Sequence, residues 1–450
     1  MKVPAATLPG KGPQIACEIH PFSTPKSRPG CARRSPTGTR TVSRRGSAPV
    51  AFRGLRGHSW RVTAGPLLLA CVITLVHYTG VYMRVPLLPL YARAHGASPA
   101  EVGGIVAAHM GLAALTAVPF GLASDHWGRA RLLFAGTLVS ALTSFALAGV
   151  TTLWALALVY AAAGLGVAAF TPSMMSLVGD AAEPGAIARA YGWYTTALYA
   201  GFGFGPILGG VAGERWGERP AFLAAGGIII VALVLAAVLV PRVPLPTRSP
   251  ARHNISAVMA NPKVLASWIV TVAGIGALGS VLTFFPLLAR ERGLGPAATG
   301  LVLGVQALVN TATRVPAGWV LDHSRPRQPY ILGGILLTGL LTAMLPLAHR
   351  LEEFLVLAAA LGSALGVAFV AVGTVLAEAT TPATRGVAMG GYSTSLYLGF
   401  AIAAFGLGPV IGTWGYGTGY AVAGGCTAAM AVGATILAQR GLRKRSCSTS

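Results

Sequence analysis

Long apolar segments are the feature of this sequence that most restricts its fold. A helix needs about 20 mostly apolar residues to cross the hydrocarbon core of a bilayer, where it satisfies its backbone hydrogen bonds internally. Twelve segments of this kind occur: 66 to 92, 99 to 122, 132 to 150, 153 to 177, 188 to 212, 219 to 240, 264 to 289, 296 to 320, 330 to 348, 354 to 377, 387 to 413 and 418 to 438. The sequence therefore predicts an all-α membrane protein with twelve transmembrane helices.

Composition supports a membrane protein and argues against a nucleic-acid partner. Of the 450 residues, 54% are hydrophobic and only 10% are charged, whereas soluble domains have about 25% charged residues. The formal net charge is +22, but the first 63 residues alone hold twelve Lys or Arg against one acid, Glu18. Because this basic charge lies largely in the tails, we expect the lipid bilayer, and no nucleic acid, as the partner. The five cysteines lack metal-site spacing, so we expect no metal and no cofactor.

Lys and Arg near the ends of the segments predict the orientation of the chain. They concentrate in alternate loops, in the stretch after the sixth segment and in both tails, and such residues favour the cytoplasmic side. We therefore expect a multi-pass protein of the cell membrane with both termini in the cytoplasm. The predicted parts are a disordered basic N-terminal tail (1–63), a six-helix N-terminal half (64–241), a cytoplasmic linker (242–263), a six-helix C-terminal half (264–440) and a basic C-terminal tail (441–450).

The two predicted halves repeat one another in sequence. VPFGLASDH, from Val118, recurs as VPAGWVLDH, from Val315, and GWYTTALYAGF, from Gly192, recurs as GGYSTSLYLGF, from Gly390. Two repeated six-helix halves with a binding site between them near the middle of the membrane are the architecture of many secondary transporters. The repeat therefore predicts that one half rocks against the other.

The loop after the second span, GLASDHWGRARLL from Gly121, resembles the signature loop of the major facilitator superfamily. His126 stands where that family usually has Arg or Lys, and the second copy has Arg325 in place of the second glycine. The resemblance implies a cytoplasmic latch in which Arg129 pairs with Asp180; alternatively, these charges only mark the interface and orient the protein. The expected gating residues are Gly121, Asp125, Gly128, Arg129, Arg131, Asp180, Gly318, Asp322, Glu378 and Arg385.

The fifth span matches the antiporter signature of the same superfamily. Its matching positions are Gly192, Gly201, Gly205, Pro206, Gly209 and Gly210. Three of these glycines lie four residues apart and form a stripe that another helix can approach closely. Ordinary packing of small residues is the alternative. The second half keeps only a partial version, GLGPVIG from Gly406, and this asymmetry favours antiport over facilitated diffusion.

Positions at which the two halves differ are expected substrate contacts, because packing preserves the repeat and a substrate breaks it. Four tyrosines join them, because an aromatic ring with a polar tip suits an amphipathic organic substrate. His77 and His109 are the titratable side chains in mid-span, either for proton transfer or as hydrogen-bonding partners between helices. Arg84 either attracts an anionic group or snorkels to the membrane edge, and for Arg314 a gating or structural role is favoured over substrate contact. The complete list of expected substrate contacts is His77, Tyr78, Tyr82, Arg84, His109, Tyr199, Gln306, Asn310, Arg314 and Tyr397.

The resemblance implies a drug or metabolite exporter of the antiporter subgroup, as in multidrug resistance. We expect secondary active efflux of a small organic compound in exchange for protons, by alternating access, from a monomer. A facilitator or importer of a sugar or related metabolite is the first alternative, and a non-transporting membrane sensor or scaffold is the second. An enzyme is not expected, because no span carries a cluster of nucleophile, base and acid.

Overall fold

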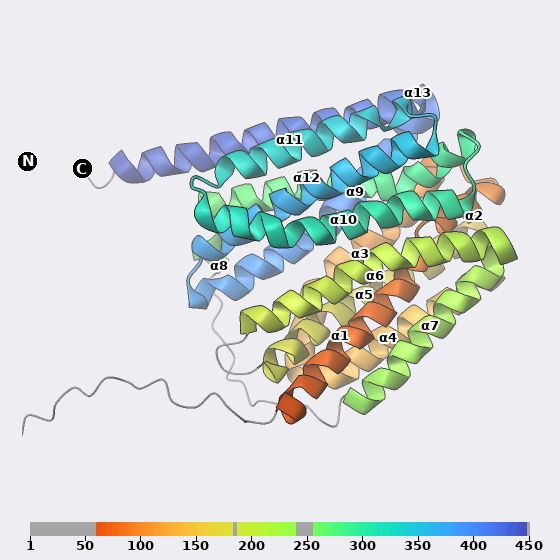
Figure 1. Ribbon diagram of the computed structural model, residues 1–450, viewed down its shortest axis with the longest axis horizontal. Helices are drawn as coiled ribbons and strands as arrows, with labels where there is room; N and C mark the ends of the chain where they lie inside the picture. The colour runs from red at the N-terminus through yellow and green to blue at the C-terminus, as the bar shows by residue number, and fades with distance from the viewer. Residues whose placement is uncertain (1–59, 183–186, 240–254, 448–450) are drawn as a thin grey trace, which may run out of the picture. The chain divides into compact units, whose positions relative to one another are not determined.

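A computed structural model describes residues 60–182, 187–239 and 255–447, which form helices joined by short turns (Figure 1). All of them belong to one compact unit, 59–450. The helices are α1 (Trp60–Met83), α2 (Leu87–Ala94), α3 (Pro99–Trp127), α4 (Arg129–Gly149), α5 (Leu153–Ala181), α6 (Ile187–Trp216), α7 (Glu218–Leu239), α8 (Ile255–Met259), α9 (Pro262–Glu291), α10 (Pro296–His323), α11 (Gln328–Met344), the 3-10 turn η2 (Leu345–Leu347), α12 (Leu351–Glu378) and α13 (Pro382–Cys447).

The observed helices account for all twelve expected spans. Among the described residues, nine helical segments are long and apolar enough to cross a membrane. The longest of them lies in α13, which breaks at Gly415, where φ is 78°, so α13 contains two spans. The remaining two spans are α6 and α10, which are 30 and 28 residues long but less apolar, because α6 is rich in glycine and α10 contains Gln306, Asn310 and Arg314.

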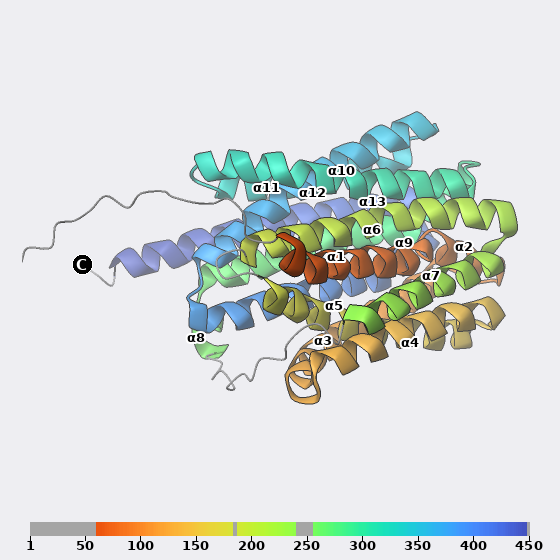
Figure 2. The ribbon, with the colours of Figure 1, turned by 60° about the horizontal axis from the view of Figure 1, so that its bottom comes forward.

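The packing of the helices repeats along the chain. In the first half α3 packs on α5, α4 on α7 and α1 on α6; in the second half α10 packs on α12, α11 on α13 and α9 on α13. Figure 1 shows α1 to α7 gathered on one side and α10 to α12 on the other, and Figure 2 shows α6 running alongside α10. The two groups meet where α6 packs on α10 and where α3 packs on α13, so these two pairs form the interface between the halves.

Local sequence explains where the helices on either side of the signature loop begin. At the start of α3, the Ser98 hydroxyl accepts a hydrogen bond from the Glu101 amide at 3.2 Å, and the Glu101 carboxylate accepts one from the Ser98 amide at 2.7 Å. This reciprocal pair satisfies two amide groups that have no partner within the helix. Between α3 and α4, Gly128 has a φ of 94°, which a residue with a side chain rarely adopts, so a tight turn is possible there.

Four boundaries differ from the expected ones. The first span is two helices, α1 and α2, separated by a turn at 84–86, because Pro86 has no amide hydrogen to continue the helix. The linker 242–263 contains α8 and the start of α9, α1 begins at Trp60 inside the predicted tail, and α13 continues through the predicted C-terminal tail to Cys447. The rest of the tail 1–63, the linker up to residue 254 and residues 448–450 lie outside the described residues.

Candidate functional site

A central cavity of about 200 Å³ lies between the two halves. Its walls come from α1, α2, α3, α5 and α6 of the first half and from α9, α10, α12 and α13 of the second half. Most of the lining is aliphatic or aromatic, and no Asp or Glu is among the described residues that line it. A mostly apolar cavity with a few polar groups is the usual form of a site for a small organic molecule.

Three tyrosines surround one phenylalanine on the first-half side of the central cavity. The Phe202 ring stacks on Tyr82 at a centroid distance of 4.0 Å, and it meets Tyr78 at 5.1 Å and Tyr199 at 5.2 Å edge to face. The Tyr78 hydroxyl lies 2.6 Å from the hydroxyl of Thr171. Aromatic pairs of this geometry prefer a fixed arrangement, so the cavity presents a rigid aromatic wall with polar hydroxyl tips.

Arg314 of α10 carries the positive charge that faces this aromatic wall. Its guanidinium carbon lies 3.8 Å from the centroid of the Tyr199 ring, across the interface between the halves. The side chain is oriented by Asn310, whose Oδ1 accepts a hydrogen bond from Nε of Arg314 at 3.0 Å. Asn310 in turn donates to the Gly362 carbonyl of α12 at 3.2 Å. Nη2 of Arg314 is buried without a hydrogen-bond partner within the described part of the chain, so it is available to a ligand.

His109 and Arg84 both pack against Tyr160 of α5. The His109 ring stacks on Tyr160 at 4.3 Å, and its Nδ1 lies 2.8 Å from the Tyr160 carbonyl oxygen. Because a carbonyl only accepts, Nδ1 carries the hydrogen and Nε2 is left free to exchange a proton. Arg84 does not snorkel: only 1% of its surface is exposed, Nε donates to the Val81 carbonyl at 3.2 Å, and the guanidinium lies 5.9 Å from the Tyr160 ring.

The sequence predicts that His77 contacts the substrate or forms hydrogen bonds between helices. The structure places its side chain elsewhere. Its ring is fully buried and stacks on Phe170 of α5 at a centroid distance of 3.7 Å and an angle of 5°. Neither ring nitrogen has a hydrogen-bond partner among the residues that the structure describes. His77 therefore packs α1 against α5 and does not line the cavity.

Eight of the ten expected substrate contacts line the central cavity; Arg84 and His77 do not. The eight are Tyr78, Tyr82, His109, Tyr199, Gln306, Asn310, Arg314 and Tyr397. Sequence reasoning missed Phe202 and Thr171. Phe202 aligns with Phe400 in the repeat, and both phenylalanines line the cavity. The signal that could have identified them is a pair of identical aromatic residues beside the antiporter motif.

An ion pair joins the signature loop to the end of α5. The Arg129 guanidinium contacts the Asp180 carboxylate, and its Nη1 also donates to the Ser176 carbonyl at 3.2 Å. Both side chains are buried, with exposed fractions of 6% and 8%. The Asp125 side chain lies outside the described residues, and Arg131 is exposed. The geometry therefore brings Arg129 and Asp180 together as the resemblance implied.

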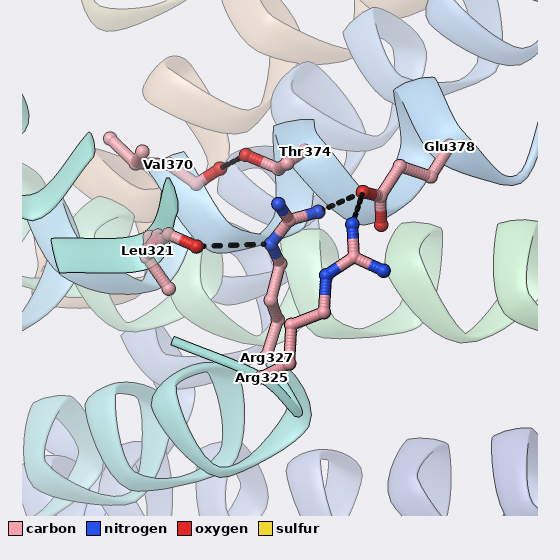
Figure 3. Close-up of polar contacts among 6 residues, drawn as sticks. All are labelled: Leu321, Arg325, Arg327, Val370, Thr374 and Glu378. Atoms are coloured by element: carbon pink, nitrogen blue, oxygen red, sulfur yellow. Dashed lines mark hydrogen bonds and ion pairs between the residues drawn. The ribbon is translucent and has the colours of Figure 1, made fainter. Parts of the chain in front are cut away.

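The second half has a corresponding ion pair that the sequence reasoning missed. Figure 3 shows the Glu378 carboxylate between Arg327, which contacts it closely, and Arg325, whose Nη2 lies 3.4 Å from Oε1. The offset that aligns Asp180 with Glu378 also aligns Arg129 with Arg327. Extending this offset through the loop would have identified Arg327.

The other expected gating positions of the second half make fewer contacts. Asp322 is exposed, and Gly318 faces open space. The Arg385 side chain lies outside the described residues. In the first half, Gly121 approaches the side chain of Pro172, at 4.0 Å from an added Cβ atom. Glu378 with its two arginines is therefore the main polar contact at this end of the second half.

The glycine stripe of the antiporter motif packs on α1. A Cβ atom added to Gly201 would lie 3.1 Å from the Thr79 amide, and one added to Gly205 would lie 2.8 Å from the Thr79 carbonyl oxygen. A Cβ atom at Gly209 would overlap the carbonyl group of Met83. The missing side chains are what allow the backbones of α1 and α6 to touch.

Glycines on the opposite side of α6 pack on α10 of the other half. A Cβ atom at Gly210 would overlap the Pro296 carbonyl, and one at Gly300 would overlap the Pro206 carbonyl. Gly192, the first motif position, faces open space. The motif therefore serves two close helix contacts, of which one joins the two halves.

Comparisons with known proteins agree with this geometry. The family model described as Major Facilitator Superfamily matches residues 70–295 and 267–446. A probable transporter of Streptomyces coelicolor is 29% identical over 88% of this chain and 92% of its own length. The multidrug resistance protein MdtG of Salmonella paratyphi A is 24% identical over 72% of this chain and 82% of its own. An uncharacterized transporter of Methanocaldococcus jannaschii is 25% identical over 37% of this chain, and the match covers 43% of that protein.

A solved structure shows the same fold. The inward-facing, unoccupied structure of a bacterial homologue of the human lysosomal transporter Spinster has a TM-score of 0.70 and 15% identity, and the match covers 86% of this chain and 98% of that one. The predictions of an all-α membrane protein, and of a transporter in place of an enzyme, are therefore confirmed. This multi-pass membrane protein belongs to the Major Facilitator Superfamily of transporters.

Proposed function

We propose that the protein exports a small organic compound in exchange for protons, by alternating access between its two halves. The observation that carries the proposal is the Arg314 guanidinium against the Tyr199 ring, because this pair unites both halves at the central cavity. The protein works as a monomer in the cell membrane, with both termini in the cytoplasm. The relative named for multidrug resistance supports export of drug-like compounds.

The chemistry of the cavity favours an aromatic or apolar compound with one anionic or hydrogen-bond-accepting group. The aromatic wall around Phe202 offers ring faces and edges to an apolar body. Arg314, Gln306 and Asn310 offer donors on the opposite side. No acid among the described lining residues competes for Arg314, so a carboxylate or phosphoryl group of the substrate is its natural partner.

Contacts between the halves support a conformation closed at one end. A Cβ atom at Gly408 of α13 would lie 2.8 Å from the Pro99 carbonyl oxygen of α3, and Gly210 of α6 approaches the Pro296 carbonyl of α10 still more closely. Pro99 and Pro296 begin their helices at the end expected to face outside. We infer that these backbone contacts close the outer gate and that they separate when the substrate leaves.

The charged contacts at the expected cytoplasmic ends would stabilise the rigid halves during this motion. Arg129 with Asp180 and Arg327 with Glu378 each join the loop after one helix to the end of another within the same half. Asp125, Gly121 and Gly128 complete the latch in the first half, and Gly318, Asp322 and Arg385 complete it in the second. His109 is the proposed proton carrier, since it lines the cavity with one ring nitrogen free.

Everted membrane vesicles test the proposal. Vesicles that contain the protein are energised to form a proton gradient, and aromatic compounds with and without a carboxylate are added. We expect carboxylated compounds to dissipate the gradient in wild-type vesicles and not in Arg314→Ala vesicles. Compound counterflow at a rate that does not depend on the proton gradient would instead indicate a facilitator. Absence of any flux in liposomes across the panel would indicate a sensor or scaffold.

A further inference from the structure

A second cavity, of about 290 Å³, lies where the ends of α9, α11, α12 and α13 meet. It shares no lining residue with the central cavity. Three basic side chains line it: Lys263 from the start of α9, and Arg325 and Arg327 from the loop between α10 and α11. Lys263 and Arg325 are exposed and only the Arg327 side chain is buried. Three like charges at one cavity repel one another, so an anion bound between them would be stabilised.

The protein supplies only part of the negative charge that would balance these cations. Glu378 is the one acid among the described residues that line the cavity, and a single oxygen, Oε1, contacts both arginines. Arg327 is held on the other side by the Leu321 carbonyl at 3.4 Å (Figure 3). The Lys263 ammonium has no acidic partner within the described ranges. The described lining therefore carries a surplus of positive charge.

Two helix N-termini add to the surplus. Lys263 and Ser267 belong to the first turns of α9, and Gln328 and Ile331 to the first turn of α11, and all four line the cavity. Neither helix has an acid in its first turn. The N-terminal end of a helix carries a partial positive charge that favours an anion. The dipoles of α9 and α11 therefore act in the same direction as the basic side chains, and the C-terminal end of α12 at Glu378 opposes them.

We propose that the second cavity binds a phosphate-type anion, either free phosphate or the phosphate of an anionic phospholipid headgroup. One guanidinium group can donate two parallel hydrogen bonds to two phosphate oxygens, and a lysine ammonium adds a point charge. Arg325 is the side chain that turns to the anion, because it is 77% exposed and its contact with Glu378 is long. Val270 and Val375 line the apolar part of the same cavity and fit the first carbons of a lipid chain.

Binding to the purified, delipidated full chain in detergent tests the proposal with two probes. Radiolabelled inorganic phosphate is followed by equilibrium dialysis at constant ionic strength, and phosphatidylglycerol is followed by native mass spectrometry against zwitterionic phosphatidylcholine. The variants Lys263→Gln and Arg325→Gln each remove a positive charge. The variant Glu378→Gln removes a negative charge, so its effect on binding should be opposite. Arg219→Gln is the matched control, because Arg219 is exposed and does not line the cavity.

We expect each lost cation to weaken binding about fivefold, since one basic side chain near an anionic lipid contributes about 1 kcal/mol. Glu378→Gln is expected to tighten binding, which a merely unfolded variant would not do. Binding of phosphatidylglycerol alone assigns the site to a lipid headgroup, and binding of both probes assigns it to free phosphate as well. Equal affinity in wild type, Lys263→Gln, Arg325→Gln and the control would overturn the proposal, as would binding of neither probe.

Discussion

The Arg314 guanidinium lies 3.8 Å from the centroid of the Tyr199 ring, and the two residues belong to opposite halves of the transporter. A cation over an aromatic face contributes about 0.5–2 kcal/mol. The contact therefore links the central cavity to the interface between the halves, which moves in the proposed mechanism. Substrate with an anionic group would engage the same guanidinium and so bias the position of the halves.

Replacing Tyr199 tests this link. We expect Tyr199→Leu to raise the substrate concentration for half-maximal transport by roughly 2- to 30-fold, as the energy range of the cation–π contact implies. Tyr199→Phe keeps a ring face and is the matched control, so it should stay close to wild type. Transport assays in vesicles measure both variants; equal effects of Leu and Phe would show that the hydroxyl, and not the ring face, is what matters.

The glycine stripe of α6 predicts opposite effects of one substitution at two positions. Gly209→Ala places a methyl group on the Met83 carbonyl, so we expect a loss of about 1–3 kcal/mol of stability, as in other overpacked sites. Gly192→Ala, on the same helix, faces open space and should be neutral or gain up to about 1 kcal/mol from helix propensity. Thermal unfolding of the purified variants in detergent measures the difference, and a similar melting temperature for both would contradict it.

The two corresponding ion pairs should differ in their contribution to stability. Asp180 is 8% exposed, whereas Glu378 is 49% exposed and also contacts Arg325. Arg129→Gln leaves a buried carboxylate without its charged partner and should cost about 3–5 kcal/mol. Arg327→Gln leaves a half-exposed carboxylate with one arginine remaining and should cost less. Chemical unfolding of both variants ranks them, and the reverse order would refute the explanation by burial.

Arg84 predicts a conflict between stability and transport. A buried arginine with no acid among its described partners is costly, and Arg84→Met removes that charge at similar length. We therefore expect a higher melting temperature for Arg84→Met. Because the Arg84 guanidinium lies behind the cavity-lining Tyr160 ring, losing its positive charge should also weaken transport of anionic compounds selectively. Neutral compounds are the internal control. Unchanged transport of both classes would reduce Arg84 to a structural residue.

His109 predicts a separation of proton coupling from substrate binding. We expect His109→Gln to retain substrate binding within a few fold, because glutamine keeps a donor toward the Tyr160 carbonyl. The same variant should lose substrate-driven proton flux, because glutamine does not titrate. His349→Gln is the matched control, since His349 is exposed. Wild-type proton flux in His109→Gln would place the proton carrier elsewhere.

The sequence by itself determined the number of spans, their approximate ends and the repeat. The requirement for about 20 apolar residues is local to each segment, and capping at Ser98 is local too. Neither the length of a span nor its helix cap depends on what the helix packs against. The resemblance of the loop to a family signature implied the Arg129–Asp180 contact, and the comparison of the two halves together with the tyrosines gave eight residues that line the cavity.

Only the tertiary structure decided which face of each helix meets the cavity. In a bilayer the lipid is as apolar as the protein core, so hydropathy does not separate a buried side chain from one facing lipid. His77 consequently turned out to stack on Phe170, Arg84 to lie buried beneath Tyr160, and Phe202 to stand among the tyrosines. The second cavity, which is basic, is lined by four helix ends that are far apart in sequence. These ends come together only when the helices pack.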